Sequence, residues 1–258
     1  MNPYIDVVGQ GQPMILVHGS FATTSTWKGM VKQLAEHHLC ILVKLPGHGG
    51  SPDITDTSNA NVETELAIIE QAWRDYANGE PVHLVGHSFG GVVALALALK
   101  GSVPIRQLTL FEPVAAWLLP QVEDHFAYQQ VMDFVADYQD ALERNEPRAA
   151  GRVVDFWGVQ GSFATLPEHI QDSLAPLIPH NLRHWKICQN VPWGVREIRQ
   201  LAMPVQLICG GDSNPVTHRI AEHIARLAPN GSKQQVAGAS HMLVTSHANE
   251  CVAAMMAD

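Results

Sequence analysis

The chain has little basic charge and no long apolar run. Its 258 residues include 16 Lys and Arg against 25 Asp and Glu, which makes a formal net charge of −9. Because an acidic surface repels phosphate backbones, we expect no nucleic-acid partner. The longest nearly unbroken apolar run, residues 92–99, is far shorter than the about 20 residues that a membrane-spanning helix needs. We therefore expect no membrane segment and no membrane partner.

Cysteines are few, and none of the four forms a CxxC pair. Cys40 and Cys209 lie in apolar runs typical of strands, where a free thiol behaves as a small buried hydrophobic group. We therefore predict no disulfide framework, and a reducing cytoplasm is the expected compartment. The first residues also lack the basic start and apolar stretch of a signal peptide.

Signals for cofactors and metals are also absent. No GxGxxG motif follows a predicted strand, so the sequence predicts no dinucleotide cofactor. His180 and His184 are four residues apart, as two metal ligands on a helix can be, but no nearby Cys or carboxylate completes a ligand set. We interpret both histidines as surface polar residues, and the sequence predicts no metal site.

Short apolar runs alternate with helical patterns along the first half of the chain, which is typical of a mostly parallel central sheet flanked by helices. Residues 114–200 have no strand pattern, and their helical periodicity and scattered prolines indicate short helices. We therefore predict an α/β protein with a core of residues 1–113 and 201–258 and an inserted helical cap at 114–200. The predicted strands lie at residues 4–8, 14–17, 40–43, 82–85, 108–111, 205–209 and 233–236, with a turn at 9–13.

The strongest chemical signal is Gly86-His87-Ser88-Phe89-Gly90, which matches G-x-S-x-G between an apolar strand and an apolar helix. A tight strand-to-helix turn requires small flanking residues and lifts the serine hydroxyl above the edge of the sheet. The start of the following helix also favours negative charge that develops there. Ser88 is therefore the predicted nucleophile, and it needs a neighbouring base.

Together with three further motifs, this turn resembles the α/β-hydrolase superfamily over nearly the whole chain, as a serine esterase-like member with a helical cap. The motifs are VHGSF at residues 17–21, LPGHG at 45–49 and GASHM at 238–242. The resemblance implies that His241 is the general base, because the family's base follows the last strand. It also implies an oxyanion hole formed by the backbone N–H groups of Ser20 and Phe89.

The acid that would orient His241 has two candidates. The family usually has an Asp after the strand predicted at 205–209, commonly three residues after a Gly, but here that count reaches Ser213 or its neighbour. Asp212 is close but out of register. Some branches, including certain haloalkane dehalogenases, carry the acid after the preceding strand, where this chain has Glu112. We therefore favour Glu112 over Asp212.

The aromatic residues of the predicted cap favour a largely apolar pocket over the catalytic edge, although most single rings are expected to pack the cap onto the sheet. We expect the protein to be a serine hydrolase that cleaves a small, largely apolar carboxylic ester through an acyl-enzyme, as a monomer or homodimer without a cofactor.

Two alternatives stay open. The loop of residues 45–51 resembles that of menaquinone-pathway lyases, and a lyase or a carbon–carbon bond hydrolase would use the same catalytic residues. Some members of this fold are instead hormone receptors with little or no turnover, so a ligand-binding role is the other alternative.

Overall fold

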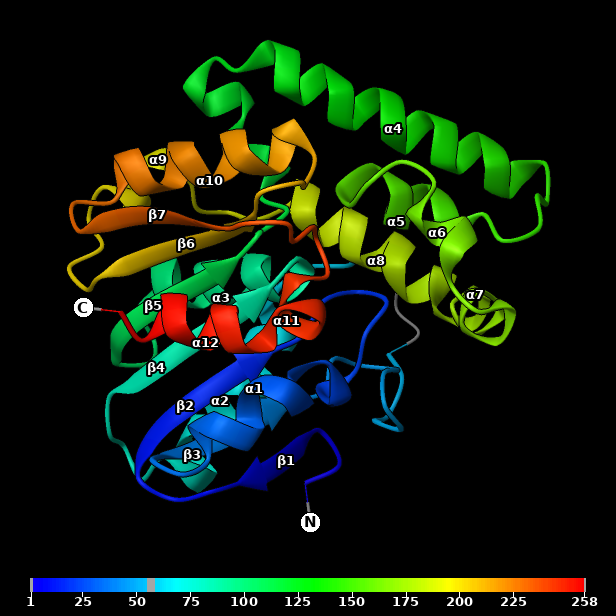
Figure 1. Cartoon of the computed structure of the whole chain (residues 1–258). Helices are drawn as coiled ribbons and strands as arrows, with labels where there is room; N and C mark the ends of the chain where they lie inside the picture. Colours follow the sequence, from blue (N-terminus) through cyan, green and yellow to red (C-terminus); the bar gives the residue numbers. More distant parts are fainter. Residues whose placement is uncertain (1, 55–58, 258) are drawn as a thin grey trace.

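The computed structural model describes residues 2–54 and 59–257, and within them the strands form one seven-stranded sheet (Figure 1). The strands are Ile5–Val8 (β1), Gln12–Val17 (β2), His38–Val43 (β3), Val82–His87 (β4), Ile105–Phe111 (β5), Val205–Gly210 (β6) and Gly231–Val236 (β7). Their order is β1-β3-β2-β4-β5-β6-β7, and β1 runs antiparallel to β3 whereas the other pairs are parallel. The predicted mostly parallel sheet is confirmed.

The predicted turn at residues 9–13 is too long by two residues, because β2 already begins at Gln12. Gln12 and Pro13 pair with β3, whereas pairing of β2 with β4 begins only at Met14. Pro13 therefore pairs with a strand on one side only. The other side has no partner strand at this position, so a residue without an N–H group is tolerated there.

Helices cover both faces of the sheet, as the alternation of side chains along each strand requires. On β2, Met14 and Leu16 face one buried cluster, whereas Ile15 and Val17 face the other. Figure 1 shows α1, α11 and α12 in front of the sheet, with α2 and α3 behind it. The bounds of these helices and of α10 are Lys28–Leu34 (α1), Glu63–Tyr76 (α2), Phe89–Lys100 (α3), Pro215–Leu227 (α10), Leu243–Ser246 (α11) and Ala248–Met255 (α12), with a 3-10 turn at Thr24–Trp27 (η1).

Between β5 and β6, within the described residues, the chain forms helices joined by turns and no strand (Figure 1). They are Ala116–Leu118 (η2), Pro120–Val122 (η3), His125–Glu143 (α4), Ala150–Trp157 (α5), Ser162–Thr165 (α6), Glu168–Ser173 (α7), Ala175–Leu177 (η4), Ile178–Gln189 (α8) and Val195–Ile198 (α9). The division into core and cap at residues 113/114 and 200/201 stays a prediction. The predicted core also includes residues 1, 55–58 and 258, which lie outside the described residues.

Neither the long helix α4 nor any other helix in the described ranges has the length and apolar character that crossing a bilayer requires.

Helix α8 is attached to the core by a buried ion pair. The Arg183 guanidinium of α8 donates to the Glu65 carboxylate of α2, and both side chains are almost completely buried. Two opposite charges can be buried only as a pair, because either charge alone would lose its hydration without compensation. The pair therefore holds one wall of the inserted segment in a defined place on the core.

This ion pair generates a stability prediction. Glu65→Gln leaves Arg183 buried without a counter-charge, so we expect the free energy of unfolding to fall by about 3–5 kcal/mol. The matched control is Glu63→Gln on the same helix, because Glu63 pairs with Lys100 at an exposed site and such pairs contribute about 1 kcal/mol or less. Urea unfolding measures both, and equal losses in the two variants would contradict the assignment. Replacing both partners together, as Glu65→Leu with Arg183→Met, should restore most of the loss.

Candidate active site

Ser88 lies between β4 and α3 in a strained backbone conformation, with φ 56° and ψ −122°. A positive φ is uncommon for a residue with a side chain, and it turns the chain sharply from strand to helix. The turn needs glycines around it. A Cβ atom on Gly86 would lie 2.4 Å from the Gly90 carbonyl oxygen, and one on Gly90 would lie 2.2 Å from the Val17 carbonyl oxygen. The spacing of the G-x-S-x-G motif is therefore explained by close backbone contacts.

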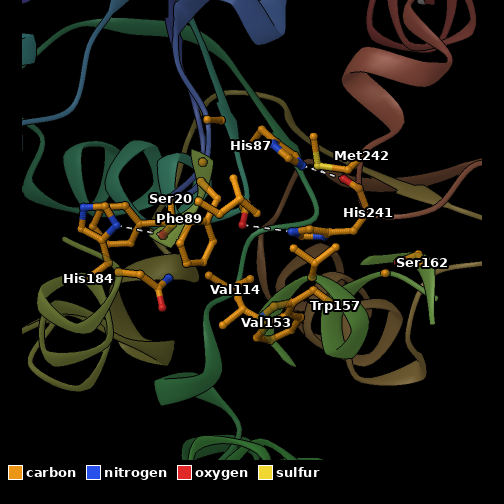
Figure 2. Close-up of a pocket in the computed structure, with 18 of the residues that line it drawn as sticks. Ser20, His87, Phe89, Val114, Val153, Trp157, Ser162, His184, His241 and Met242 are labelled. Atoms are coloured by element: carbon orange, nitrogen blue, oxygen red, sulfur yellow. Dashed lines mark hydrogen bonds between the residues drawn. The ribbon is translucent and has the colours of Figure 1, made fainter. Parts of the chain in front are cut away.

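The structure brings His241 from the loop after β7 to Ser88. The distance between His241 Nε2 and Ser88 Oγ is 3.0 Å, and the dashed line from the His241 ring in Figure 2 marks this bond. On its other side, His241 Nδ1 lies 2.6 Å from Glu112 Oε2. A hydroxyl, an imidazole and a carboxylate thus form one continuous hydrogen-bonded chain.

Glu112 directly follows β5 and is completely buried. Its other oxygen, Oε1, accepts hydrogen bonds from the backbone N–H of Gly210 at 2.6 Å and from the hydroxyl of Ser213 at 2.5 Å. Both carboxylate oxygens therefore have partners, as a buried charge requires. Ser213 is one of the two residues, with Asn214, that the family's usual spacing reaches, and in this chain it supports the carboxylate of Glu112.

Asp212, the second candidate for the acid, has an exposed side chain. Its backbone N–H donates to the Ala239 carbonyl oxygen at 2.9 Å, which fixes the loop after β6. The structure joins Ser88, His241 and Glu112, and it leaves the Asp212 carboxylate outside that chain.

Ser20 and Phe89, the residues expected to supply an oxyanion hole, line the same cavity as Ser88. The loop after β2 approaches the nucleophile closely, since a Cβ atom on Gly19 would lie 3.0 Å from the Ser88 Cβ atom. Phe89 is the first residue of α3, where the helix leaves N–H groups without an acceptor. The backbone N–H of Ser20 likewise donates no hydrogen bond to an acceptor within residues 2–54 and 59–257. Both donors are free to bind a substrate oxygen.

The cavity over Ser88 has a volume of about 350 Å³. One of its walls is apolar and comes from α5, α6, α7 and the turns between them, through Val153, Trp157, Leu166, Ile170 and Leu174. The Trp157 ring stacks over His241 with a centroid distance of 6.0 Å, and Figure 2 shows it beside the imidazole. The same ring packs against other cap aromatics, including Phe156 and Trp185. The expected apolar pocket is therefore present.

The sequence interpretation of His180 and His184 as surface residues is wrong. His184 is buried, and its Nδ1 atom lies 2.8 Å from Ser20 Oγ. His180 is half-buried and lies 3.4 Å from Asp53. Both belong to the face of α8 that packs on the core, and the spacing of Asn181, His184 and Cys188 along one helical face was the available signal.

A further histidine that the sequence did not single out lies directly against the site. His87, the residue before Ser88, is buried, and its Nε2 donates to the His241 carbonyl oxygen at 2.7 Å. Burial, together with the smaller effect of the neighbouring His241, lowers the pKa of His87 to about 3. His87 is therefore a neutral support beneath His241 and not a second acid or base at neutral pH.

Among the residues that the structure describes, no group of three or more His, Cys, Asp or Glu side chains could hold a metal ion.

Several known proteins are similar to this chain in sequence or in fold. Residues 14–254 match the model described as the alpha/beta hydrolase family. Pimeloyl-[acyl-carrier protein] methyl ester esterase of Methylococcus capsulatus is 27% identical over 258 residues, which cover 96% of this chain and 94% of that protein. Abhydrolase domain-containing protein abhd-5.2 of Caenorhabditis elegans is 31% identical over 153 residues, but the match spans only 34% of that longer protein and 59% of this chain.

Two solved structures have the same fold. MenH from S. aureus superposes with a TM-score of 0.75 at 18% identity, covering 98% of this chain and 96% of that chain. A thermophilic esterase from Thermogutta terrifontis also has a TM-score of 0.75, at 19% identity, covering 97% of this chain and 90% of that chain.

Because His87, next to Ser88, is buried in its neutral form, we expect the protein to lose stability in acid. The folded pKa of His87 is about 3, whereas an unfolded histidine has a pKa of about 6.5. Between these values the unfolded chain binds a proton that the folded chain does not. The free energy of unfolding therefore falls as the pH falls below 6.5, by about 2 kcal/mol from this group at pH 5.

Urea unfolding at pH 7 and pH 5 measures this contribution. The difference between the two pH values should be about 2 kcal/mol smaller in His87→Gln than in the unchanged protein. His83→Gln is a second test at a distance from Ser88, because burial also lowers the pKa of His83 to about 3. If both variants kept the full pH dependence, neither His87 nor His83 would be its source.

Proposed function

The chain belongs to the alpha/beta hydrolase family and is a hydrolase, and on this premise we propose that it cleaves a small, largely apolar carboxylic ester through an acyl-enzyme at Ser88. One observation carries the proposal: the continuous hydrogen-bonded chain from Ser88 Oγ through His241 to the buried carboxylate of Glu112. A serine hydroxyl is a weak nucleophile, and this arrangement is the one that activates it.

In the proposed reaction, Ser88 Oγ attacks the ester carbonyl carbon while His241 Nε2 accepts the hydroxyl proton. Glu112 accepts the Nδ1–H of His241, so the ring presents the lone pair of Nε2 to Ser88 and its protonated form gains a counter-charge. His241 then returns the proton to the leaving alcohol oxygen as the carbon–oxygen bond breaks. A water molecule, deprotonated by His241, then attacks the acyl carbon; the bond from that carbon to Ser88 Oγ breaks, His241 returns the proton to Ser88 Oγ, and the carboxylic acid is released.

In the tetrahedral intermediate, the backbone N–H groups of Ser20 and Phe89 stabilise the negative charge on the former carbonyl oxygen. Each such donor contributes about 10²–10³ in rate in hydrolases of this kind. The free N–H group of Ser20 and the first N–H of α3 support this role. The positive end of the α3 dipole adds to the same stabilisation.

The apolar wall of the cavity supports an ester with an apolar acyl or alcohol group. The relatives named methyl ester esterases support a small alkyl alcohol as the leaving group. We further propose that the substrate is a small molecule, that the protein needs neither nucleic acid nor membrane, and that it acts as a monomer or homodimer.

The proposal predicts hydrolysis of p-nitrophenyl butyrate and of methyl butyrate, with complete loss in Ser88→Ala. A fluorophosphonate probe should label Ser88 in the unchanged protein and leave Ser88→Ala unlabelled. The matched control is His247→Gln, because His247 lies six residues after His241 and is the N-cap residue before α12; it should keep turnover within about twofold. An active Ser88→Ala variant, or no turnover of either ester, would overturn the proposal. Labelling without any ester turnover would instead favour a lyase, a carbon–carbon bond hydrolase or a binding role.

A second prediction separates the two candidate acids. Glu112→Gln should lower kcat by about 10³–10⁴, because the amide stabilises the wrong tautomer of His241 and provides no counter-charge. Asp212→Asn should change kcat by less than about twofold, since its side chain is exposed and outside the hydrogen-bonded chain. Steady-state kinetics with circular dichroism as a folding control measures both. The opposite ranking of the two variants would assign the role to Asp212.

A further inference from the structure

One side chain of the inserted helical segment contacts both residues of the proposed oxyanion hole. His184 of α8 lies 2.8 Å from Ser20 Oγ through its Nδ1 atom. Its ring also stacks flat on the Phe89 ring, with a centroid distance of 3.8 Å and an interplanar angle of 9°. Figure 2 shows the imidazole of His184 against the phenyl ring and bonded to Ser20. Ser20 and Phe89 come from different elements, so this single ring ties two separate backbone segments together.

Ser20 is also held from its carbonyl side. His48 Nε2 lies 2.5 Å from the Ser20 carbonyl oxygen and its Nδ1 lies 2.8 Å from the Pro46 carbonyl oxygen, and the His48 and His184 rings stack with centroids 5.4 Å apart. The peptide of Ser20 is thereby fixed at its oxygen by His48 and at its side chain by His184. Its N–H group is left free to face the cavity.

The charge state of His184 suits this location. Burial is the main cause that holds the pKa of His184 well below its ordinary value, and His48 and Arg183 lower it further. The ring is neutral, so it does not attract the oxyanion directly. Its effect must come through the contacts that it makes with Ser20 and Phe89.

The position of the ring is itself fixed by the core. The residue before it, Arg183, forms the buried ion pair with Glu65 of α2. The backbone of α8 therefore cannot shift without separating two buried charges, and the imidazole one residue later is held at a constant height above α3.

We propose that His184 is a positioning residue that aligns the backbone N–H groups of Ser20 and Phe89 with the oxygen of the substrate carbonyl. This inference rests on the proposed function. An oxyanion donor must lie about 2.7–3.1 Å from the position of the oxyanion, and a displacement of about 1 Å can cost 10²-fold in rate. Loss of the contact therefore affects the transition state and not the apolar part of the cavity that binds the rest of the substrate.

The experiment compares four variants in p-nitrophenyl butyrate hydrolysis. Ser20→Ala removes the hydroxyl and keeps the backbone N–H, whereas His184→Phe keeps a flat ring on Phe89 and removes the hydrogen bond. Each should lower kcat by about tenfold with KM changed by less than about twofold. The double variant should be no slower than the slower single variant, because both remove the same bond. His184→Asn can place an amide atom near the position of Nδ1, and it should recover at least a third of the lost kcat.

A transition-state readout accompanies the kinetics. The inhibition constant of a trifluoromethyl ketone should rise in the same proportion as kcat/KM falls, because its oxyanion uses the same two donors. The control is His169→Asn, since His169 is an exposed histidine on the neighbouring helix α7 and should leave kcat, KM and inhibition unchanged.

Unchanged kcat in Ser20→Ala, additive losses in the double variant, or a rise in KM alone would overturn the inference. Ser20→Ala carries the test by itself if His184→Phe does not fold. Failure of the proposed function is separate, because it would leave Ser88→Ala active or leave the unchanged protein without turnover of either ester. If Ser88→Ala is inactive while Ser20→Ala and His184→Phe keep full kcat, only the role of His184 is wrong.

Discussion

The buried carboxylate of Glu112 is the group on which the geometry of the site depends. A charge without exposure to water must be hydrogen-bonded on every side, and its partners are therefore drawn to it. Here those partners come from the end of β6, from the loop that follows it and from the loop after β7. Through His241 the connection reaches Ser88 at the end of β4. Because parallel strands end at the same edge of the sheet, one carboxylate on β5 can link all of these segments.

The residue His241 is held from three sides, two of them at its ring and one at its backbone. Glu112 accepts its Nδ1–H, His87 binds its carbonyl oxygen and Trp157 covers its ring. The neutrality of His87 matters in this arrangement, because a second positive charge beneath His241 would oppose protonation of the imidazole in the proposed reaction. Burial keeps the pKa of His87 low enough to prevent this. The same burial that limits stability in acid therefore keeps a second positive charge away from His241.

The sheet and the elbow at Ser88 were predictable because their signals are local. Apolar runs mark the strands, and G-x-S-x-G describes a turn whose glycines are required by contacts within a few residues or with the adjacent strand. The preference for Glu112 followed from the resemblance to branches of the family that carry the acid after the strand that Glu112 follows here. The location of His184 was not predictable in the same way, because its burial depends on how α8 packs on the core, and a histidine is equally compatible with the surface. The role of Ser213 was not predictable for the same reason. The family's usual spacing led to this position as one place for the acid, whereas its hydroxyl supports the acid candidate Glu112.

The cavity therefore has two walls of different physical character. Helix α8 contributes directional contacts, through Arg183 to the core and through His184 to the loop that carries Ser20. The wall formed by α5 to α7 contributes apolar side chains such as Val153 and Leu174, whose contacts are not directional and tolerate different shapes. In the proposed function, the directional wall determines where the carbonyl group of the ester lies, since rate depends steeply on that position. The apolar wall determines which chain is attached to it, because burial depends on area and not on exact placement. In the proposed function, the position of the carbonyl group and the choice of the attached chain thus depend largely on different helices, and Trp157 of α5 is the point where the two meet, because its ring also covers His241.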